Sequence, residues 1–109
     1  MTFYIKQNDT APALRVQLKD GDGDGVTLTD ATVRFHMRPI GAASTVVDAS
    51  AEVVVSAVAT GLVQYDWDAA DTSTVGIYQG EFEVTYSDGS IETFPNNSYI
   101  TIEVTDDIT

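Results

Sequence analysis

Three carboxylates in a short glycine-rich run are the first residues of this chain whose spacing could do chemistry. Asp20, Asp22 and Asp24 alternate with glycines, and together with Gly25 they match the start of an EF-hand calcium loop. The last position of such a loop should be a bidentate glutamate, and in this chain it is Ala31. The flanking residues also predict strands rather than helices. The run therefore favours a surface turn, with weak calcium binding at the three aspartates as the alternative.

The single histidine is the next candidate for chemistry, and it lies between two arginines in the alternating row Arg34, His36, Arg38. Catalysis by an imidazole needs a carboxylate or nucleophile close by, and the spacing suggests none. Cysteine is absent, which excludes thiol nucleophiles, disulfides and thiolate metal sites. No serine has the context of a nucleophile elbow. We therefore expect no enzymatic activity, and we expect the row to pair with acids of a neighbouring strand or to meet an acidic partner.

The charge distribution narrows the choice of partners. The 109 residues carry a net charge of −12, and all five basic residues lie in the first 38 positions. Because phosphate contacts need a basic face, we expect no binding to nucleic acid or to an anionic membrane. No apolar run approaches the roughly 20 residues of a membrane span. The N-terminus lacks the basic and apolar regions of a signal peptide, so we expect synthesis and assembly in a cytoplasm.

The elements that must position these residues are strands. In residues 78–86 apolar side chains alternate with polar ones, which is typical of a strand with one buried face and one solvated face. Asp88-Gly89 then gives a strong signal for a hairpin. A two-residue loop there would place Tyr86 opposite Ile91, and Phe94 would then point outward.

Further segments show the same period or a β-branched composition, and together they predict a single domain over residues 1–109. Trp67 is interpreted as a core anchor, and Asp68 as the cap of one helical turn that closes at Gly76. We expect an all-β fold, a two-sheet antiparallel sandwich of the immunoglobulin-like type, without the cysteine pair of antibody domains. The other predicted strands are 2–8, 13–19, 31–38, 45–48, 52–59, 62–68 and 98–104.

Three segments, 18–38, 61–71 and 76–97, together resemble a known family. The pattern LTDATVRFHMR … GLVQYDWDAADTSTVGIYQGEFEVTYSDGSIETFPNN is similar to the Ig-like domain at the N-terminus of tailed-phage baseplate upper proteins, and to related small phage structural proteins. The resemblance implies a component of the virion, because in that family the domain attaches a receptor-binding or fibre assembly to the tail. No receptor-binding part follows the domain in this sequence, so we expect a building block or adaptor of the tail, baseplate, neck or head.

Two functions follow as expectations. The first is a virion structural protein that contacts other phage proteins and copies of itself, and that uses no cofactor. Its candidate contact residues are Arg34, His36, Arg38, Glu83 and Phe94. In one version of this hypothesis the basic row of one copy meets the acidic outward face of residues 61–104 of another. The alternative is a binding module, displayed on the capsid or tail, for a host-surface glycan or for calcium. Its candidate sugar-stacking aromatics are Tyr4, Phe94 and Tyr99.

Overall fold

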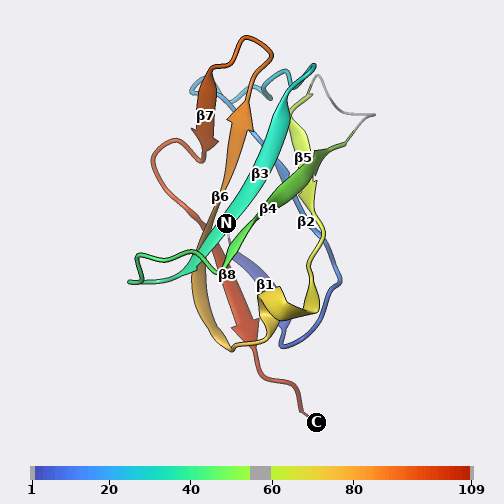
Figure 1. Ribbon diagram of the computed structural model, residues 1–109, viewed down its shortest axis with the longest axis vertical. Coiled ribbons are helices and arrows are strands. Elements are labelled where there is room, and N and C mark those ends of the chain that lie inside the picture. The colour runs from blue at the N-terminus through green and yellow to red at the C-terminus, as the bar shows by residue number, and fades with distance from the viewer. Residues whose placement is uncertain (1, 55–59, 109) are drawn as a thin grey trace.

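The computed structural model describes residues 2–54 and 60–108, and these form an all-β sandwich (Figure 1). This confirms the fold class and the helical turn predicted after Trp67. The turn is a 3₁₀ helix, η2 (Ala69–Thr72), and Asp68 caps it as expected, but it ends at Ser73 rather than at Gly76, which instead begins a strand. The strands are β1 (Thr2–Lys6), β2 (Leu14–Gln17), β3 (Thr32–Pro39), β4 (Val47–Val53), β5 (Leu62–Tyr65), β6 (Gly76–Thr85), β7 (Ile91–Phe94) and β8 (Ile100–Thr105).

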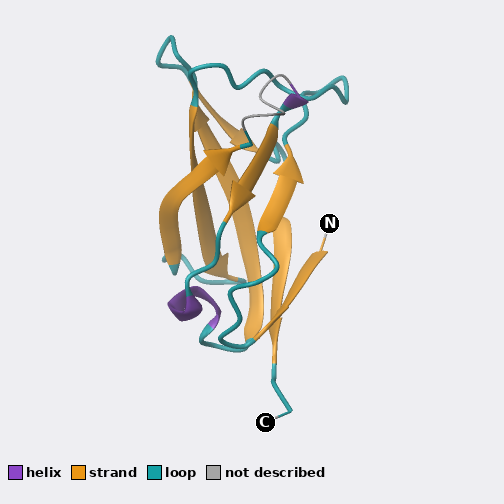
Figure 2. Ribbon diagram, turned by 90° about the vertical axis from the view of Figure 1, so that its right-hand side faces the viewer, coloured by secondary structure: helices purple, strands orange, loops and turns teal. Residues whose placement is uncertain are grey.

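The strands are arranged in two layers (Figure 2), and β4 belongs to both because it pairs with β3 and with β5. The large sheet has the order β1-β8-β6-β3-β4, with β7 paired to the C-terminal part of β6. The small sheet has the order β4-β5-β2. The pair β1–β8 is parallel and the other strand pairs are antiparallel. Because β1 and β2 belong to different sheets, the chain crosses between the layers around Pro12, a residue that cannot continue a strand ladder.

Aromatic side chains from both layers fill the space between the sheets. Phe35 of β3 lies 4.7 Å from Tyr65, 5.7 Å from Trp67 and 5.0 Å from Phe82, measured between ring centroids. Trp67 is buried among them, which confirms its prediction as a core anchor. Such tilted and edge-on ring pairs stabilise a core beyond their buried area.

The β6–β7 hairpin corrects the predicted loop. The amide of Tyr86 donates to the carbonyl of Ser90 over 2.8 Å, and the amide of Gly89 donates to the carbonyl of Tyr86 over 2.9 Å. The loop between the paired residues is therefore three residues long rather than two. Gly89 has a φ of 88°, a left-handed conformation that a loop of this length requires at its last position.

This extra loop residue reverses the two faces of β7. Thr85 now faces Ile91, and Phe82 faces Phe94. Since neighbouring residues of a strand point to opposite faces, a shift of one residue exchanges the buried and exposed sets. Ile91 is 63% exposed and Phe94 is 2% exposed, so the prediction that Phe94 points outward is wrong.

Two predicted strands in the middle of the chain are arranged differently. The segments 45–48 and 52–59 were expected as separate strands, and β4 (Val47–Val53) spans parts of both. Residues 55–59 of the second prediction lie outside the described residues. In the part of the chain that is described, no helix is long and apolar enough to cross a membrane.

Candidate interaction surface on the large sheet

The outer face of the large sheet brings together most of the polar residues singled out in the sequence. Strands β3 and β6 are paired so that Arg34 lies opposite Glu83, and His36 lies opposite Glu81. On the other side of β3, His36 lies opposite Asp48 of β4. The basic row therefore already has acidic neighbours within its own chain, on both flanking strands.

Asp48 is the carboxylate that pairs with this row. Its Oδ1 lies 2.9 Å from Nη2 of Arg34 and 3.1 Å from Nε2 of His36. The guanidinium of Arg34 also donates to the backbone carbonyl of Asp48 over 2.9 Å. The hydrogen bond from Arg34 holds the pKa of Asp48 below its usual value. Pairing with a neighbouring strand is thus confirmed for Arg34 and His36. The side chains of Arg34 and Asp48 are both exposed to solvent, and exposed ion pairs contribute little to stability.

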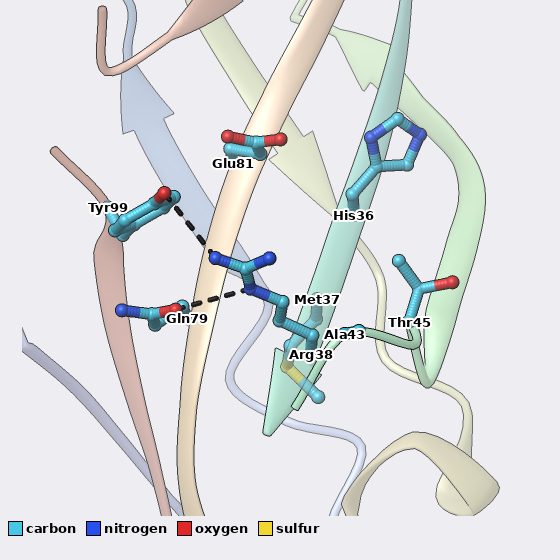
Figure 3. A pocket seen from close by; sticks show the side chains of 8 residues that line it. All are labelled: His36, Met37, Arg38, Ala43, Thr45, Gln79, Glu81 and Tyr99. Carbon is cyan, nitrogen blue, oxygen red and sulfur yellow. Dashed lines mark hydrogen bonds between the residues drawn. The ribbon is translucent and has the colours of Figure 1, made fainter. Parts of the chain in front are cut away.

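Arg38 is held in a different way, by two neutral groups (Figure 3). Its Nε donates to Oε1 of Gln79 over 3.3 Å, and its Nη2 donates to the hydroxyl of Tyr99 over 3.4 Å. Its guanidinium carbon lies 5.4 Å from the centroid of the Tyr99 ring, within the range of a cation–π contact. Among the described residues no carboxylate lies within ion-pair distance of Arg38.

Two hollows adjoin on this face, and Glu81 and Tyr99 line both of them. The first has a volume of about 160 Å³ and is bordered by Arg38 and Gln79 (Figure 3). The second has a volume of about 290 Å³ and is bordered by residues 95–98 between β7 and β8. Both are open to solvent, and their linings combine polar and apolar surface.

Exposed apolar residues lie beside the outward polar residues of β3 and β6, where these two strands meet the loop that leads to β4. The amide of Ile40 donates to the carbonyl of Ile77 over 3.0 Å, which places these two residues side by side. Ile77 is 45% exposed and Ile40 is 61% exposed. Val46, whose amide donates to the carbonyl of Met37, is also exposed, on the side of β3 away from β6. Ile40, Val46 and Ile77 are called the apolar patch below.

Sequence reasoning missed the apolar patch, although one signal was present. Ile77 occupies the register of Gln79 and Glu81, so an isoleucine there breaks the polar pattern of the outward face. Ile40 belongs to a loop and carries no periodic signal. Only the pairing of β3 with β6 brings the two together.

The sugar-stacking candidates are separated by the fold. Phe94 is buried against Phe82, so it is neither a stacking residue nor a contact residue, because the hairpin register turns it inward. Tyr4 is exposed on β1, opposite Glu103 of β8. Tyr99 lies between the two hollows described above.

The acidic outward residues do not form one face, as had been expected for residues 61–104. Glu81 and Glu83 lie on the large sheet. Gln64 and Asp66 lie at the small sheet, where the amide of Gln64 donates to Asp66 over 2.8 Å. There, a hydrogen bond with Asp66 raises the pKa of Glu52.

The aspartate-glycine run adopts the geometry of a turn. Oδ1 of Asp20 accepts hydrogen bonds from the amides of Asp22 and Asp24, over 2.9 Å and 3.1 Å. The backbone amide of Asp20 donates to the carbonyl of Asp24 over 2.8 Å, and Lys19 bridges to Gly25. The first carboxylate is thus engaged by the loop itself. Within residues 2–54 and 60–108, no three His, Cys, Asp or Glu side chains gather as a group that could hold a metal ion.

Comparisons with known proteins identify the fold and nothing more. No family model matches the sequence, and no curated protein matches it. Among solved structures, CopC from Methylosinus trichosporium OB3b superposes with a TM-score of 0.55, over 99% of this chain and 87% of CopC. The two sequences are 16% identical, so the likeness extends to the β-sandwich alone and CopC lends no function to this chain.

Proposed function

We propose that this chain is a structural protein of a bacteriophage virion, assembled in the host cytoplasm. It serves as a building block or adaptor of the tail, baseplate, neck or head, and it acts by contacting other phage structural proteins or copies of itself. The sequence resemblance described above supports this proposal. The β-sandwich is compatible with it.

The observation that carries the proposal is the apolar patch. A single exposed isoleucine or valine is normal on any protein surface. Here Ile40 and Ile77 are exposed side by side, and Val46 is exposed across β3 from Ile77. Apolar side chains that stay in water have a favourable free energy of burial, which supports a protein contact at this end of the sheet. The adjoining polar rows of β3 and β6 would form the hydrated rim that such contacts have.

We further infer that the chain works without catalysing a reaction. The histidine is hydrogen-bonded to Asp48 on an open sheet face, with a solvated carboxylate and an arginine beside it. To act as a general base, His36 would need a hydroxyl or thiol nucleophile, or a substrate proton, within hydrogen-bond reach. Its charged neighbours Arg34 and Asp48 are neither.

Mass spectrometry of purified particles of the phage that encodes this chain tests the proposal. We expect the protein in the particles at a constant ratio to the major structural proteins. A double substitution in the apolar patch, Ile40→Asp with Ile77→Asp, should prevent incorporation, because charges there cannot be buried without a partner. Ile91→Asp is the matched control, since Ile91 is an exposed isoleucine at the opposite end of the same sheet face.

Absence of the unaltered protein from purified particles would overturn the proposal. Normal incorporation of the double variant together with loss of the Ile91→Asp variant would overturn the assignment of the contact to the apolar patch and move it to the other end of the sheet. Circular dichroism of each purified variant shows whether it is folded before incorporation is compared.

A further inference from the structure

We propose that the two hollows beside Tyr99, whose linings combine polar and apolar groups, form a shallow binding site for a neutral saccharide. This inference goes beyond a structural role in the virion and does not depend on it. It starts from the position of Tyr99, which borders both hollows and is 45% exposed. A half-exposed aromatic ring between two hollows of mixed lining offers an apolar surface with hydrogen-bonding groups on both sides.

The donor groups of the site are held in place before any ligand arrives. Gln79 and Tyr99 fix the guanidinium of Arg38 through its Nε and Nη2 atoms (Figure 3). Its Nη1 makes no hydrogen bond to the described residues, so it remains available at the wall of the first hollow. A fixed side chain loses less conformational entropy on binding than a mobile one, which favours recognition by Arg38.

The acceptor groups lie within the same space. Glu81 lines both hollows, and its position opposite His36 on the paired strands keeps it on the outer face. The second hollow adds Thr93, Asn96 and Asn97 to the lining. A hydroxyl group both donates and accepts, so a ligand with several adjacent hydroxyls can satisfy Arg38 and Glu81 together.

The mixture of charges selects a neutral ligand. Glu81 repels an anion, as does the net charge of −12, and Arg38 repels a cation. A pyranose carries hydroxyls around its edge and C–H groups on its faces, and those faces can pack on the Tyr99 ring. Neutral saccharides therefore match the lining better than acidic saccharides, amines or phosphates do.

The shape of the site predicts weak binding. Both hollows are open, so they bury only part of a sugar, and affinity for one copy should be about millimolar. Many copies displayed together would raise the effective affinity by avidity, without any new contact. The site would then act on an extended glycan surface rather than on a free monosaccharide.

Titration of the ¹⁵N-labelled protein, followed by two-dimensional NMR, tests the inference. The probes are trisaccharides of glucose, mannose, rhamnose and N-acetylglucosamine, with trigalacturonate as the acidic comparison. At least one neutral trisaccharide should shift the resonances of Gln79, Glu81 and residues 96–99 in a saturable way.

Tyr99→Ala should weaken that binding roughly tenfold through loss of the stacking surface. Tyr4→Ala is the matched control, because Tyr4 is an exposed tyrosine outside both hollows, and it should leave binding unchanged.

Several results would overturn the inference. They are no saturable shift with any neutral probe, shifts confined to another face, tighter binding of trigalacturonate than of every neutral probe, or unchanged binding by the Tyr99→Ala variant. The experiment uses the isolated protein, so its failure leaves incorporation into particles untouched. Conversely, absence from particles would not alter saccharide binding in solution.

Discussion

Phe82 and Phe94 lie directly opposite each other on β6 and β7, and both are buried in the core. This pairing exists only because the hairpin loop has three residues. A two-residue loop would have buried Ile91 and turned Phe94 toward solvent. The position of one phenylalanine thus reports the register of the whole hairpin.

Replacing these two residues should have very different effects on stability. We predict that Phe94→Ala lowers the free energy of unfolding by about 3–5 kcal/mol, because it leaves a cavity beside Phe82. Ile91→Ala should change it by less than about 0.5 kcal/mol, because Ile91 is exposed. Urea denaturation measures both. A larger loss for the Ile91 variant would contradict the observed register.

Gly80 should not tolerate a methyl group, although it lies in a strand. A Cβ at this position would lie 2.6 Å from Cδ1 of Ile102 and 3.0 Å from Cε1 of Phe35. Both neighbours are buried and cannot move freely, so Gly80→Ala should cost about 1–3 kcal/mol in overpacking. Gly21→Ala is the control, because a Cβ there meets nothing within 4 Å. Equal thermal stability of the two variants would show that the core near Gly80 has room.

Asp71 should be coupled energetically to Tyr65. One carboxylate oxygen of Asp71 accepts hydrogen bonds from the hydroxyl of Tyr65 and from the amide of Asp68. Burial, and then the hydrogen bond to Asp71, raise the pKa of Tyr65. We predict a loss of about 1–3 kcal/mol for Asp71→Ala, because the buried hydroxyl loses its partner. The double variant with Tyr65→Phe should lose less than the sum of the single variants.

The control for this cycle removes the other half of the helix cap. Asp68→Ala removes the acceptor of the Ala70 amide and should cost about 1 kcal/mol. It leaves the bond between Asp71 and the Tyr65 hydroxyl in place, so its effect should add to that of Tyr65→Phe. Strict additivity for the Asp71 pair, measured by denaturant unfolding, would contradict the coupling.

The pairing of Asp48 with Arg34 should make stability depend on pH in the acidic range. The pKa of Asp48 is lowered in the folded chain, chiefly by the hydrogen bond from Arg34, so the folded state binds its proton less readily than the unfolded state. The stabilisation is therefore present above the ordinary value of 3.8 and is lost as the pH falls through the lowered pKa. Asp48→Asn should be less stable than the unaltered chain at neutral pH, and the difference should shrink below that value. A difference that does not change with pH would contradict the ion pair.

Much of the fold could be predicted from local patterns. The alternation in residues 31–38 and 62–68 identified the inward residues of β3 and β5, because a strand with one buried face repeats every two residues. The capped turn after Trp67 followed from the side chain of Asp68, because aspartate is favoured at a helix start, where it accepts a hydrogen bond from an unpaired backbone amide. These features depend on residues that are close together in the sequence.

The candidate surface could be predicted only in part. The row on β3 was visible because its three residues alternate within one strand. Its acidic neighbours could not be placed, since Asp48 and Glu81 come from different segments that meet β3 on opposite sides. Ile40 and Ile77 are likewise distant in the sequence, and a strand pairing joins them.

By itself, the sequence determined most of the segments that are strands, which residues in most of them face inward, and where most of the turns lie. The tertiary structure decided how those strands align. Asp88-Gly89 is compatible with a loop of two or three residues, and burial of Phe94 against Phe82 accompanies the longer one. Register between distant strands depends on packing across the whole sandwich, which no local pattern contains. For this reason the sequence indicated the polar row and Tyr99, whereas the fold alone produced the hollows and the apolar patch.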